Sequence, residues 1–229
     1  MQPNVDKGYK GIGMEGRIAT WYARNTARDM PHFAALAEQV TAALPEGSRV
    51  LEVAPSPGYL AIEIMRCGAY QVSGLDISRT FVEIARRNAQ AAQVTIDFRQ
   101  GNASAMPFTE DSFDLIVCRA AFKNFSQPIA AMNEMHRVLK PGARALIIDL
   151  RKDASMHDIN AYIRQSDLSL ANSIIYRATF RYLLLPRAYS RQQFADMAAS
   201  SAFSETHITT SVIGAEVTLR KGRQANDPR

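Results

Sequence analysis

The chain has 229 residues, of which 47% are hydrophobic and 21% charged, a composition that excludes a disordered protein and fits one globular domain. Two cysteines are too few for a disulfide framework and lack the spacing of a metal site, so we expect Cys67 and Cys118 to be buried thiols. The net charge of +5 is uneven: +2 over residues 1–30 (5 basic, 3 acidic), −1 over 31–150 (11 and 12) and +4 over 151–229 (11 and 7).

The sequence contains no segment long enough to span a membrane. The longest apolar runs, at 145–148 and 183–185, are far shorter than the ~20 residues that cross a bilayer. The start of the chain, Met1-Gln2-Pro3-Asn4, lacks the apolar run of a secretory signal. We therefore expect a cytoplasmic protein that does not insert into membranes.

The middle of the chain alternates between the periodicities of strands and helices. Short apolar runs predict five buried strands, at 49–54, 71–77, 94–99, 114–118 and 143–149. Amphipathic segments predict the helices between them, at 59–67, 81–91 and 129–139, with Ser78 as the N-cap of the second helix. This alternation predicts a parallel sheet with right-handed crossovers.

The alternation stops after residue 149. A helical stretch follows, then a helix at 191–200 and an antiparallel hairpin at 205–212 and 215–221. We predict an α/β fold: a doubly wound, mostly parallel, Rossmann-like sheet of seven strands with a C-terminal antiparallel hairpin. Residues 1–229 would form a single domain, divided into an N-terminal lid, a core, a helical cap and a final helix with its hairpin, at 1–30, 31–150, 155–187 and 190–221.

The loop after the first strand, EVAPSPG at 52–58, is the first place where a ligand is expected, because doubly wound sheets bind ligands beyond the carboxyl ends of their strands. A dinucleotide loop would need glycines at 54, 56 and 59, and residue 59 is Tyr. Pro55 and Pro57 each remove a backbone N–H that a phosphate cradle would use. The loop argues against NAD, FAD and ATP, and it leaves Glu52 free to accept a hydrogen bond from an ammonium group.

Polar residues also follow the next strands. Asp76 ends the second strand, 24 positions after Glu52, where a carboxylate suits the hydroxyls of a ribose. Asn102 follows the third strand, and its amide can read the amino edge of an adenine. Arg119 stands at the tip of the fourth strand. These positions together suit a nucleoside ligand without a pyrophosphate.

At these residues the chain resembles the class I S-adenosylmethionine-dependent methyltransferases, in the small-molecule branch of the ubiquinone/menaquinone type. The resemblance covers residues 45–150, and its most specific part is HRVLKPG at 136–142. It implies that the chain binds S-adenosylmethionine and releases S-adenosylhomocysteine. The loop at 52–58 would contact the methionine part, Asp76 the ribose, Asn102 and Ala103 the adenine, and Arg119 the sulfonium side. The implied cofactor residues are Glu52, Ala54, Pro55, Ser56, Gly58, Asp76, Ile77, Asn102, Ala103 and Arg119.

The chain departs from this family at two positions in the loop. The family has glycines where this chain has Ala54 and Ser56, so two side chains enter a place where backbone approaches the ligand closely. Either the cofactor lies farther out, or its binding is weak or lost.

The two ends of the chain, which carry the positive charge, are expected to bind the acceptor. The resemblance implies an N-terminal lid, with Tyr9, Met14, Trp21, Tyr22 and Asn25 as candidate contacts, although Trp21 and Tyr22 could simply anchor a helix to the core. Phe122 and Asn124 would line the same cavity from the loop after the fourth strand. Five arginines and one acidic residue, Asp167, lie between 164 and 191, with Arg177 and Arg181 on one helical face. An anionic substrate, a nucleic acid, a membrane surface or simple solvation would each explain these arginines.

Methyl transfer from a sulfonium depends mainly on proximity and orientation, and it needs a base only if the acceptor loses a proton. Asp149, His157 and Lys123 are the candidate catalytic residues, with a purely structural role as the alternative for Asp149 and Lys123. The spacing of the histidines indicates no metal site. We predict a methyltransferase acting on a small, anionic or aromatic molecule. The alternatives are a non-catalytic cofactor-binding protein and a nucleic-acid methyltransferase, and the chain lacks the Asn/Asp-Pro-Pro-aromatic motif of the latter.

Overall fold

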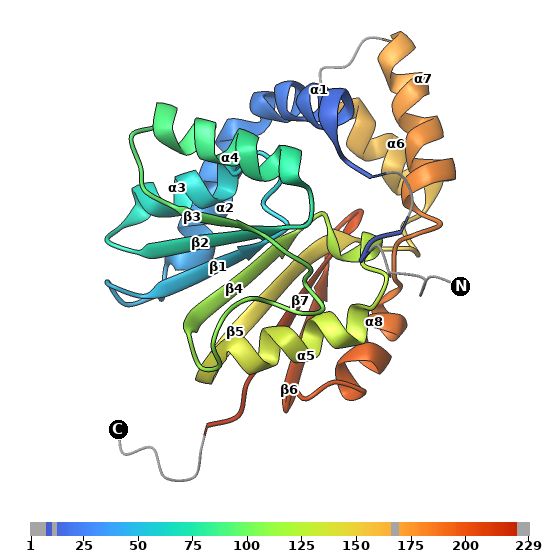
Figure 1. The fold of residues 1–229 in the computed structure, drawn as a ribbon. Coiled ribbons are helices and arrows are strands. Elements are labelled where there is room, and N and C mark those ends of the chain that lie inside the picture. The colour runs from blue at the N-terminus through green and yellow to red at the C-terminus, as the bar shows by residue number, and fades with distance from the viewer. Residues whose placement is uncertain (1–7, 11–12, 166–169, 224–229) are drawn as a thin grey trace, which may run out of the picture.

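The computed structural model describes residues 8–10, 13–165 and 170–223 (Figure 1). Part of the predicted lid, at 1–7 and 11–12, and Asp167 of the predicted cap lie outside the described residues. Across the described ranges, no helix is both long and apolar enough to cross a bilayer. The same ranges contain no group of three or more His, Cys, Asp or Glu side chains that could hold a metal ion.

Seven strands form one sheet in the order β3-β2-β1-β4-β5-β7-β6. The first five strands are mutually parallel, and β7 runs antiparallel between β5 and β6. The predicted fold class is thereby confirmed, including the C-terminal hairpin. The strands are β1 (Arg49–Val53), β2 (Gln71–Asp76), β3 (Asp97–Gln100), β4 (Phe113–Arg119), β5 (Leu139–Leu150), β6 (Glu205–Thr210) and β7 (Gly214–Arg220).

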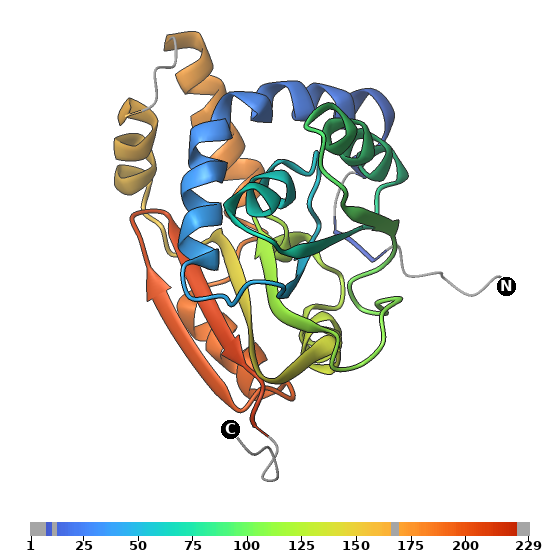
Figure 2. The same ribbon diagram turned by 90° about the vertical axis from the view of Figure 1, so that its left-hand side faces the viewer.

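Helices cover both faces of this sheet, and two further groups lie beyond its carboxyl edge (Figures 1 and 2). One face is covered by α2 (Met30–Thr41), α3 (Tyr59–Cys67) and α4 (Arg79–Ala91), and the other by α5 (Pro128–Val138) and α8 (Arg191–Ala199). At the carboxyl edge lie α1 (Gly16–Thr26), α6 (Met156–Gln165) and α7 (Leu170–Thr179), which continues as a π-helical segment at Phe180–Leu184.

The alternation of side chains along each strand creates the two cores. On β4, Ile116 and Cys118 face the core under α5 and α8, whereas Leu115 and Val117 face the core under α2, α3 and α4. All four side chains are fully buried. Strands covered on both faces read as continuous apolar runs, which is why the sequence pattern identified them.

The structure corrects the sequence-based prediction at two places, the start of β5 and Cys67. Helix α5 ends at Val138 and β5 begins at Leu139, so Pro141 lies inside a strand, where Gly142 (φ +77°) and a register shift between Phe113 and Leu115 form a bulge. Cys118 is buried as expected, but Cys67 is exposed because it ends α3. The predicted helical cap contains α6, α7 and the π-helical segment, and residues 166–169 lie outside the described residues.

Gly58 provides a test of the packing that holds the loop after β1. Its backbone has φ +80°, and an added Cβ would lie 2.9 Å from both Ala85 Cβ and Phe98 Cζ. Gly47 has φ +78°, but an added Cβ there would meet nothing within 4 Å, so its substitution measures the cost of the left-handed backbone alone. We expect Gly47→Ala to lower the free energy of unfolding by ~1 kcal/mol and Gly58→Ala to lower it by a further ~1–3 kcal/mol, measured by urea denaturation. Equal losses would contradict the close packing.

Candidate active site

The loop between β1 and α3 has the backbone of a glycine-rich loop without its glycines. Ala54 and Ser56 adopt φ +57° and +52°, the left-handed region that favours glycine, and Gly58 follows with φ +80°. Each non-glycine residue in this region costs on the order of 1 kcal/mol or more and persists only where the surroundings impose it. The loop therefore has the backbone conformation of a glycine-rich ligand loop, although Ala54 and Ser56 carry side chains that glycines would lack.

Asp76 is one of the groups that impose this conformation. Its buried carboxylate accepts a hydrogen bond from the Ser56 N–H at 3.0 Å and from the Ser78 N–H at 2.9 Å. It thus joins the β1 loop to the start of α4, where Ser78 is the N-cap as predicted. Burial raises the pKa of Asp76 to about 6, although both N–H groups oppose the rise.

Glu52 is buried at the end of β1 and is only half satisfied. The backbone N–H of Ala61 donates to this carboxyl group, but its Oε2 atom is buried without a hydrogen-bond partner. Burial raises the pKa of Glu52 to about 8, with Arg119 and the Ala61 N–H opposing the rise. An unpartnered buried acceptor is costly, so it marks a place where a donor from a ligand would be stabilised.

Arg119 stands at the end of β4, where its guanidinium lies 4.6 Å from the centroid of the Phe33 ring. This cation–π contact holds the arginine between α2 and the carboxyl edge of the sheet. Sequence reasoning did not single out Phe33, because a lone phenylalanine on a helix carries no signal beyond that of a core residue.

The N-terminal segment lies across the ends of β2 and β3. Tyr9 forms an antiparallel bridge with Phe125, and the Lys10 N–H donates to the Asn124 carbonyl at 2.6 Å. Gly8 is buried and packs closely against two candidate cofactor residues. A Cβ added to it would lie 2.5 Å from Ile77 Cδ1 and 2.8 Å from Asn102 Nδ2. Candidate lid residues and candidate cofactor residues are therefore brought together at this edge.

The lid continues into α1 through contacts with the start of α4. The Ser78 hydroxyl donates to the Met14 carbonyl at 2.6 Å, and the Glu15 carboxylate accepts from the N–H groups of Arg79 and Thr80. Sequence reasoning missed Glu15, although a carboxylate close to a helix N-terminus is favoured electrostatically. The lid and the Asp76 loop thus share one anchor, the first turn of α4.

The aromatic residues of α1 divide between the core and solvent. Tyr22 packs edge-to-face against Phe81, with ring centroids 5.8 Å apart. Trp21 is 67% exposed, and Asn25 donates its side-chain amide to the Trp21 carbonyl at 3.0 Å. Tyr22 therefore anchors the helix, whereas Trp21 lies on the outer side of α1, away from the candidate site.

Lys123 and Asp149 form a buried ion pair, with Nζ and Oδ1 2.8 Å apart and side chains only 7% and 0% exposed. The Asp149 carboxylate also accepts from the backbone N–H groups of Lys123, at 2.8 Å, and of Leu150, at 2.7 Å. The Lys123 ammonium additionally donates to the carbonyl of Ala120, which has φ +57°. These contacts brace the tips of β4 and β5 and engage both groups, which favours the structural alternative for them.

The other candidate residues lie in different surroundings. Phe122 is fully buried among Phe125, Tyr189 and Phe194, and it supports the loop after β4 from below. The His157 side chain is 87% exposed on α6, 3.8 Å from the Asp158 carboxylate. Arg177 and Arg181 are exposed on and beyond α7. The structure therefore brings the cofactor candidates together but leaves His157 and these two arginines outside that cluster.

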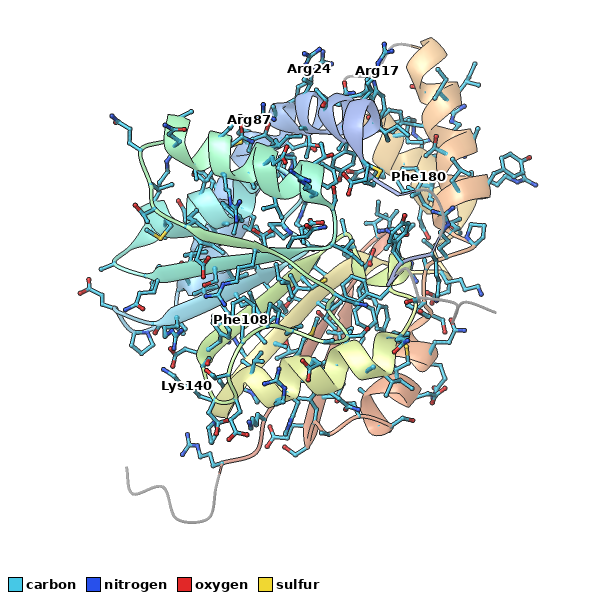
Figure 3. All side chains as sticks on the ribbon, viewed as in Figure 1. Arg17, Arg24, Arg87, Phe108, Lys140 and Phe180 are labelled. Atoms are coloured by element: carbon cyan, nitrogen blue, oxygen red, sulfur yellow. The ribbon has the colours of Figure 1, made fainter. Side chains whose placement is uncertain are left out.

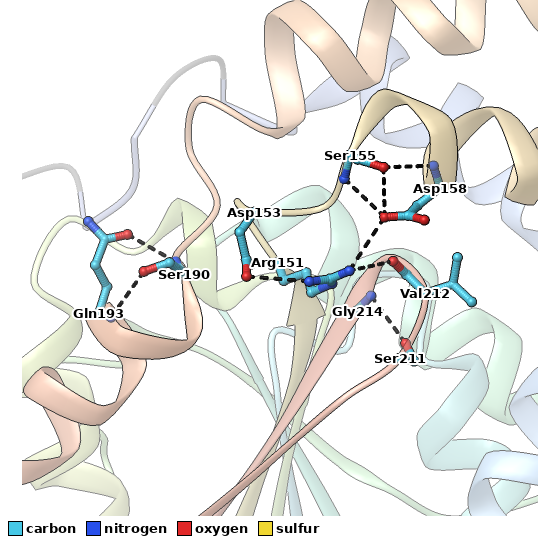
Figure 4. A network of polar contacts seen from close by, with 9 residues as sticks. All are labelled: Arg151, Asp153, Ser155, Asp158, Ser190, Gln193, Ser211, Val212 and Gly214. Atoms are coloured by element: carbon cyan, nitrogen blue, oxygen red, sulfur yellow. Dashed lines mark hydrogen bonds and ion pairs between the residues drawn. The ribbon is translucent and has the colours of Figure 1, made fainter.

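The cap containing α6 is fixed to the sheet by Arg151, directly after β5 (Figure 4). Its guanidinium contacts the carboxylates of Asp153 at 3.3 Å and Asp158 at 3.5 Å and donates to the Val212 carbonyl at 3.1 Å. Arg151 therefore joins the start of the cap to the turn between β6 and β7.

A doubly wound sheet with a ligand loop after β1 and an acidic residue at the end of β2 defines the class of Rossmann-like domains that bind nucleoside-containing ligands. A family model for a methyltransferase domain matches residues 51–147. A demethylmenaquinone methyltransferase of Deinococcus radiodurans is 36% identical over 108 residues, which are 47% of this chain and 45% of that protein. The chain spans about half the length of several curated relatives that it matches.

Solved structures show the same fold over most of the chain. A protein of Methanococcus maripaludis, provisionally assigned as an S-adenosyl-L-methionine-dependent methyltransferase, has a TM-score of 0.72 at 18% identity, covering 95% of this chain and 98% of that one. A [4+2]-cyclase has a TM-score of 0.65 at 19% identity, covering 83% and 81%. Within residues 51–147 the chain matches a methyltransferase domain, and these relatives and folds agree with it, which confirms the resemblance seen in the sequence.

Glu52 makes the stability of the free protein depend on pH. Its pKa is about 8 in the folded protein and 4.5 for the free side chain, so folding binds a proton between these two values, and stability falls as the pH rises from 4.5 to about 8 and then levels off. We expect the free energy of unfolding of the wild type to drop by on the order of a few kcal/mol between pH 6.5 and 8.5. Glu52→Gln should remove most of this drop, and exposed Glu38→Gln should preserve it, in urea denaturation at both pH values. An unchanged drop in Glu52→Gln would refute the assignment.

The Lys123–Asp149 brace can be compared with the more exposed pair of Lys140 and Asp114, whose side chains are 41% and 28% exposed. Lys123→Met leaves a buried carboxylate without its counter-ion, so we expect it to lower the free energy of unfolding by ~3–5 kcal/mol. The same change at Lys140 should cost less than ~1 kcal/mol, because water solvates the remaining carboxylate. Chemical denaturation of both variants measures the difference, and similar costs would show that the buried pair is not a brace.

Proposed function

We propose that this protein transfers a methyl group from S-adenosylmethionine to a small quinone-type molecule in the cytoplasm. One observation carries the proposal: Glu52 Oε2 is buried without a partner at the end of β1, directly before the loop in which Ala54 and Ser56 keep the glycine conformation. A carboxylate at this point suits the ammonium group of the methionine part, as a charge-assisted hydrogen bond. Matches to demethylmenaquinone methyltransferases support the choice of acceptor class.

The other parts of the cofactor have candidate partners along the same edge. Asp76 and Ile77 would hold the ribose, and Asn102 and Ala103 the adenine, beneath the N-terminal segment. Pro55, Ser56 and Gly58 would contact the methionine part with backbone and small side chains. Arg119 would lie on the sulfonium side, where its contact with Phe33 keeps it in place.

The bound cofactor supplies an electrophilic methyl group, and the protein aligns the acceptor with it. Lys123 and Asp149 are engaged with each other and with backbone groups, so neither is available to remove a proton from the acceptor. We therefore propose an acceptor that ionises readily by itself, such as an acidic hydroxyl group on an aromatic or quinone ring. This agrees with the anionic or aromatic class expected from the sequence.

A non-catalytic role is the second candidate, and it is favoured by Ala54 and Ser56, which stand in the left-handed backbone region where the family has glycines. The [4+2]-cyclase also shows that this fold is not confined to proteins described as methyltransferases. Cofactor binding and methyl transfer must therefore be measured separately.

Binding is tested with S-adenosylhomocysteine by isothermal titration calorimetry at pH 7. We expect binding to the wild type to release close to one proton, because Glu52, with a pKa of about 8, must ionise beside the ammonium group. Glu52→Gln should weaken binding at least ~10-fold and abolish the proton release. The matched control is Glu63→Gln on α3, a buried glutamate paired with Arg66 at 2.7 Å, which should bind as the wild type does.

The transfer itself is tested with methyl-labelled S-adenosylmethionine and a panel of hydroxylated quinones, with RNA and DNA as comparison acceptors. We expect label in the small molecules only. Binding of S-adenosylhomocysteine without any transfer would support the non-catalytic role. Label in nucleic acid would show that the acceptor is a nucleic acid and not a quinone-type molecule. If millimolar S-adenosylhomocysteine does not bind at all, the proposal is refuted.

A further inference from the structure

Exposed apolar side chains are concentrated at one end of the molecule. Ten large hydrophobic residues are exposed among the described residues, and eight of them belong to α1, α6, α7 and the π-helical segment. These elements lie together beyond the carboxyl edge of the sheet (Figures 1 and 2). The eight are Ile18, Trp21, Tyr162, Ile174, Ile175, Tyr176, Tyr182 and Leu183. A concentration of this kind marks an interaction surface more than scattered apolar residues would.

Helix α7 and its continuation make few buried contacts. Between residues 173 and 183 only Phe180 is buried, and it packs with Ile159 and Ile163 of α6. Helical spacing places Ile174 and Ile175 on the side away from Phe180. Both are more than 60% exposed. The helix therefore has one side on the cap and an apolar side with no protein partner in the described chain.

Helix α1 presents a similar outer side. Ala19 and Ala23 are buried against α4, and Trp21 is exposed on the opposite side. Arg17 and Arg24 lie four residues before and three residues after Trp21, so all three share this outer side. Figure 3 shows Arg17 and Arg24 pointing away from the body of the protein.

The charged residues within α1, α7 and the π-helical segment are all basic. Arg17 and Arg24 flank Trp21, and Arg177 and Arg181 lie among the exposed residues of α7 and its continuation. None of the four takes part in an ion pair within the described ranges, and Arg181 lies over the Tyr182 ring at 5.5 Å. We call this surface the docking face, defined by Arg17, Trp21, Arg24, Ile174, Ile175, Arg177, Arg181 and Tyr182.

We propose that the docking face binds peripherally to the surface of an anionic lipid bilayer. Aliphatic and aromatic side chains interleaved with arginines are typical of helices that lie in the bilayer interface, where the apolar groups enter the headgroup region and the cations pair with lipid phosphates. No spanning helix is needed. The docking face lies beyond the carboxyl edge that carries the candidate site, so docking would bring that edge toward the membrane (Figure 1).

Charge and chemistry favour the bilayer over two other occupants. A second copy of the chain, related by a two-fold axis, would bring the unpaired arginines of one docking face against those of the other, which is repulsive. A nucleic acid would pair with the arginines but would leave Ile174 and Ile175 against phosphates and sugars. Only a lipid surface satisfies both sets of side chains.

The test measures binding of the full-length protein, without cofactor, to sedimented vesicles of 70% phosphatidylcholine and 30% phosphatidylglycerol, with pure phosphatidylcholine as the comparison. We expect binding to the anionic vesicles that weakens with salt. Each arginine contributes roughly fivefold to the binding constant, so Arg177→Glu with Arg181→Glu should weaken binding at least ~25-fold. Arg191→Glu with Arg223→Glu, the same charge change at exposed positions on α8 and after β7, should have a much smaller effect.

The apolar half of the proposal has its own readout, because Trp21 is the only tryptophan of the chain. We expect its emission to shift to shorter wavelength with anionic vesicles, and Ile174→Ser with Ile175→Ser to weaken binding without unfolding, as checked by circular dichroism. Absence of vesicle binding, or equal losses in the control pair, would overturn the proposal. So would a concentration-dependent dimer that the two serine substitutions abolish, or tighter binding to RNA than to vesicles. None of these readouts depends on methyl transfer.

Discussion

The burial of two carboxyl groups at one edge of a parallel sheet is the constraint on which the site depends. Asp76 is stabilised there by the N–H groups of Ser56 and Ser78, so it fixes the β1 loop against the first turn of α4. The same turn receives Glu15 and donates from Ser78 to Met14, so the lid is attached to the same anchor. Glu52 has no comparable set of donors, and its unpartnered oxygen is the observation on which the proposed cofactor site rests.

The edge also stores strain. Ala54, Ser56 and Ala120 hold left-handed backbone conformations without being glycine, and all three follow strands that point at the site. Asp76 holds Ser56, and the Lys123–Asp149 pair holds the carbonyl of Ala120. The strong interactions of this region thus maintain a defined backbone in the free protein, which reduces the ordering that a ligand would have to impose.

The sequence predicted the strands and the core helices because strands covered on both faces are apolar and helices have one apolar side. It also placed Glu52, Asp76, Asn102 and Arg119 near one another, since parallel strands deliver their ends to one edge. Two predictions from the sequence were wrong. Cys67 is exposed because of where α3 ends, and Pro141 lies within β5 because a bulge there accommodates it. The sequence also could not separate Tyr22 from Trp21, because neighbouring aromatic residues on a helix differ only in which side meets the core.

The sequence by itself determined the fold class, the resemblance to methyltransferases and the edge at which a ligand is expected, because periodicity and local motifs encode these. The tertiary structure decided which polar side chains are already engaged in hydrogen bonds and ion pairs within the protein. Lys123 and Asp149 are 26 residues apart and have similar prospects in the sequence as catalytic groups, yet packing pairs them and engages both. It also decided that the exposed apolar and basic residues of α1 and α7 lie at the same end of the molecule. Contacts between side chains that are distant in the sequence depend on how helices and strands pack, and a local sequence pattern does not contain that information.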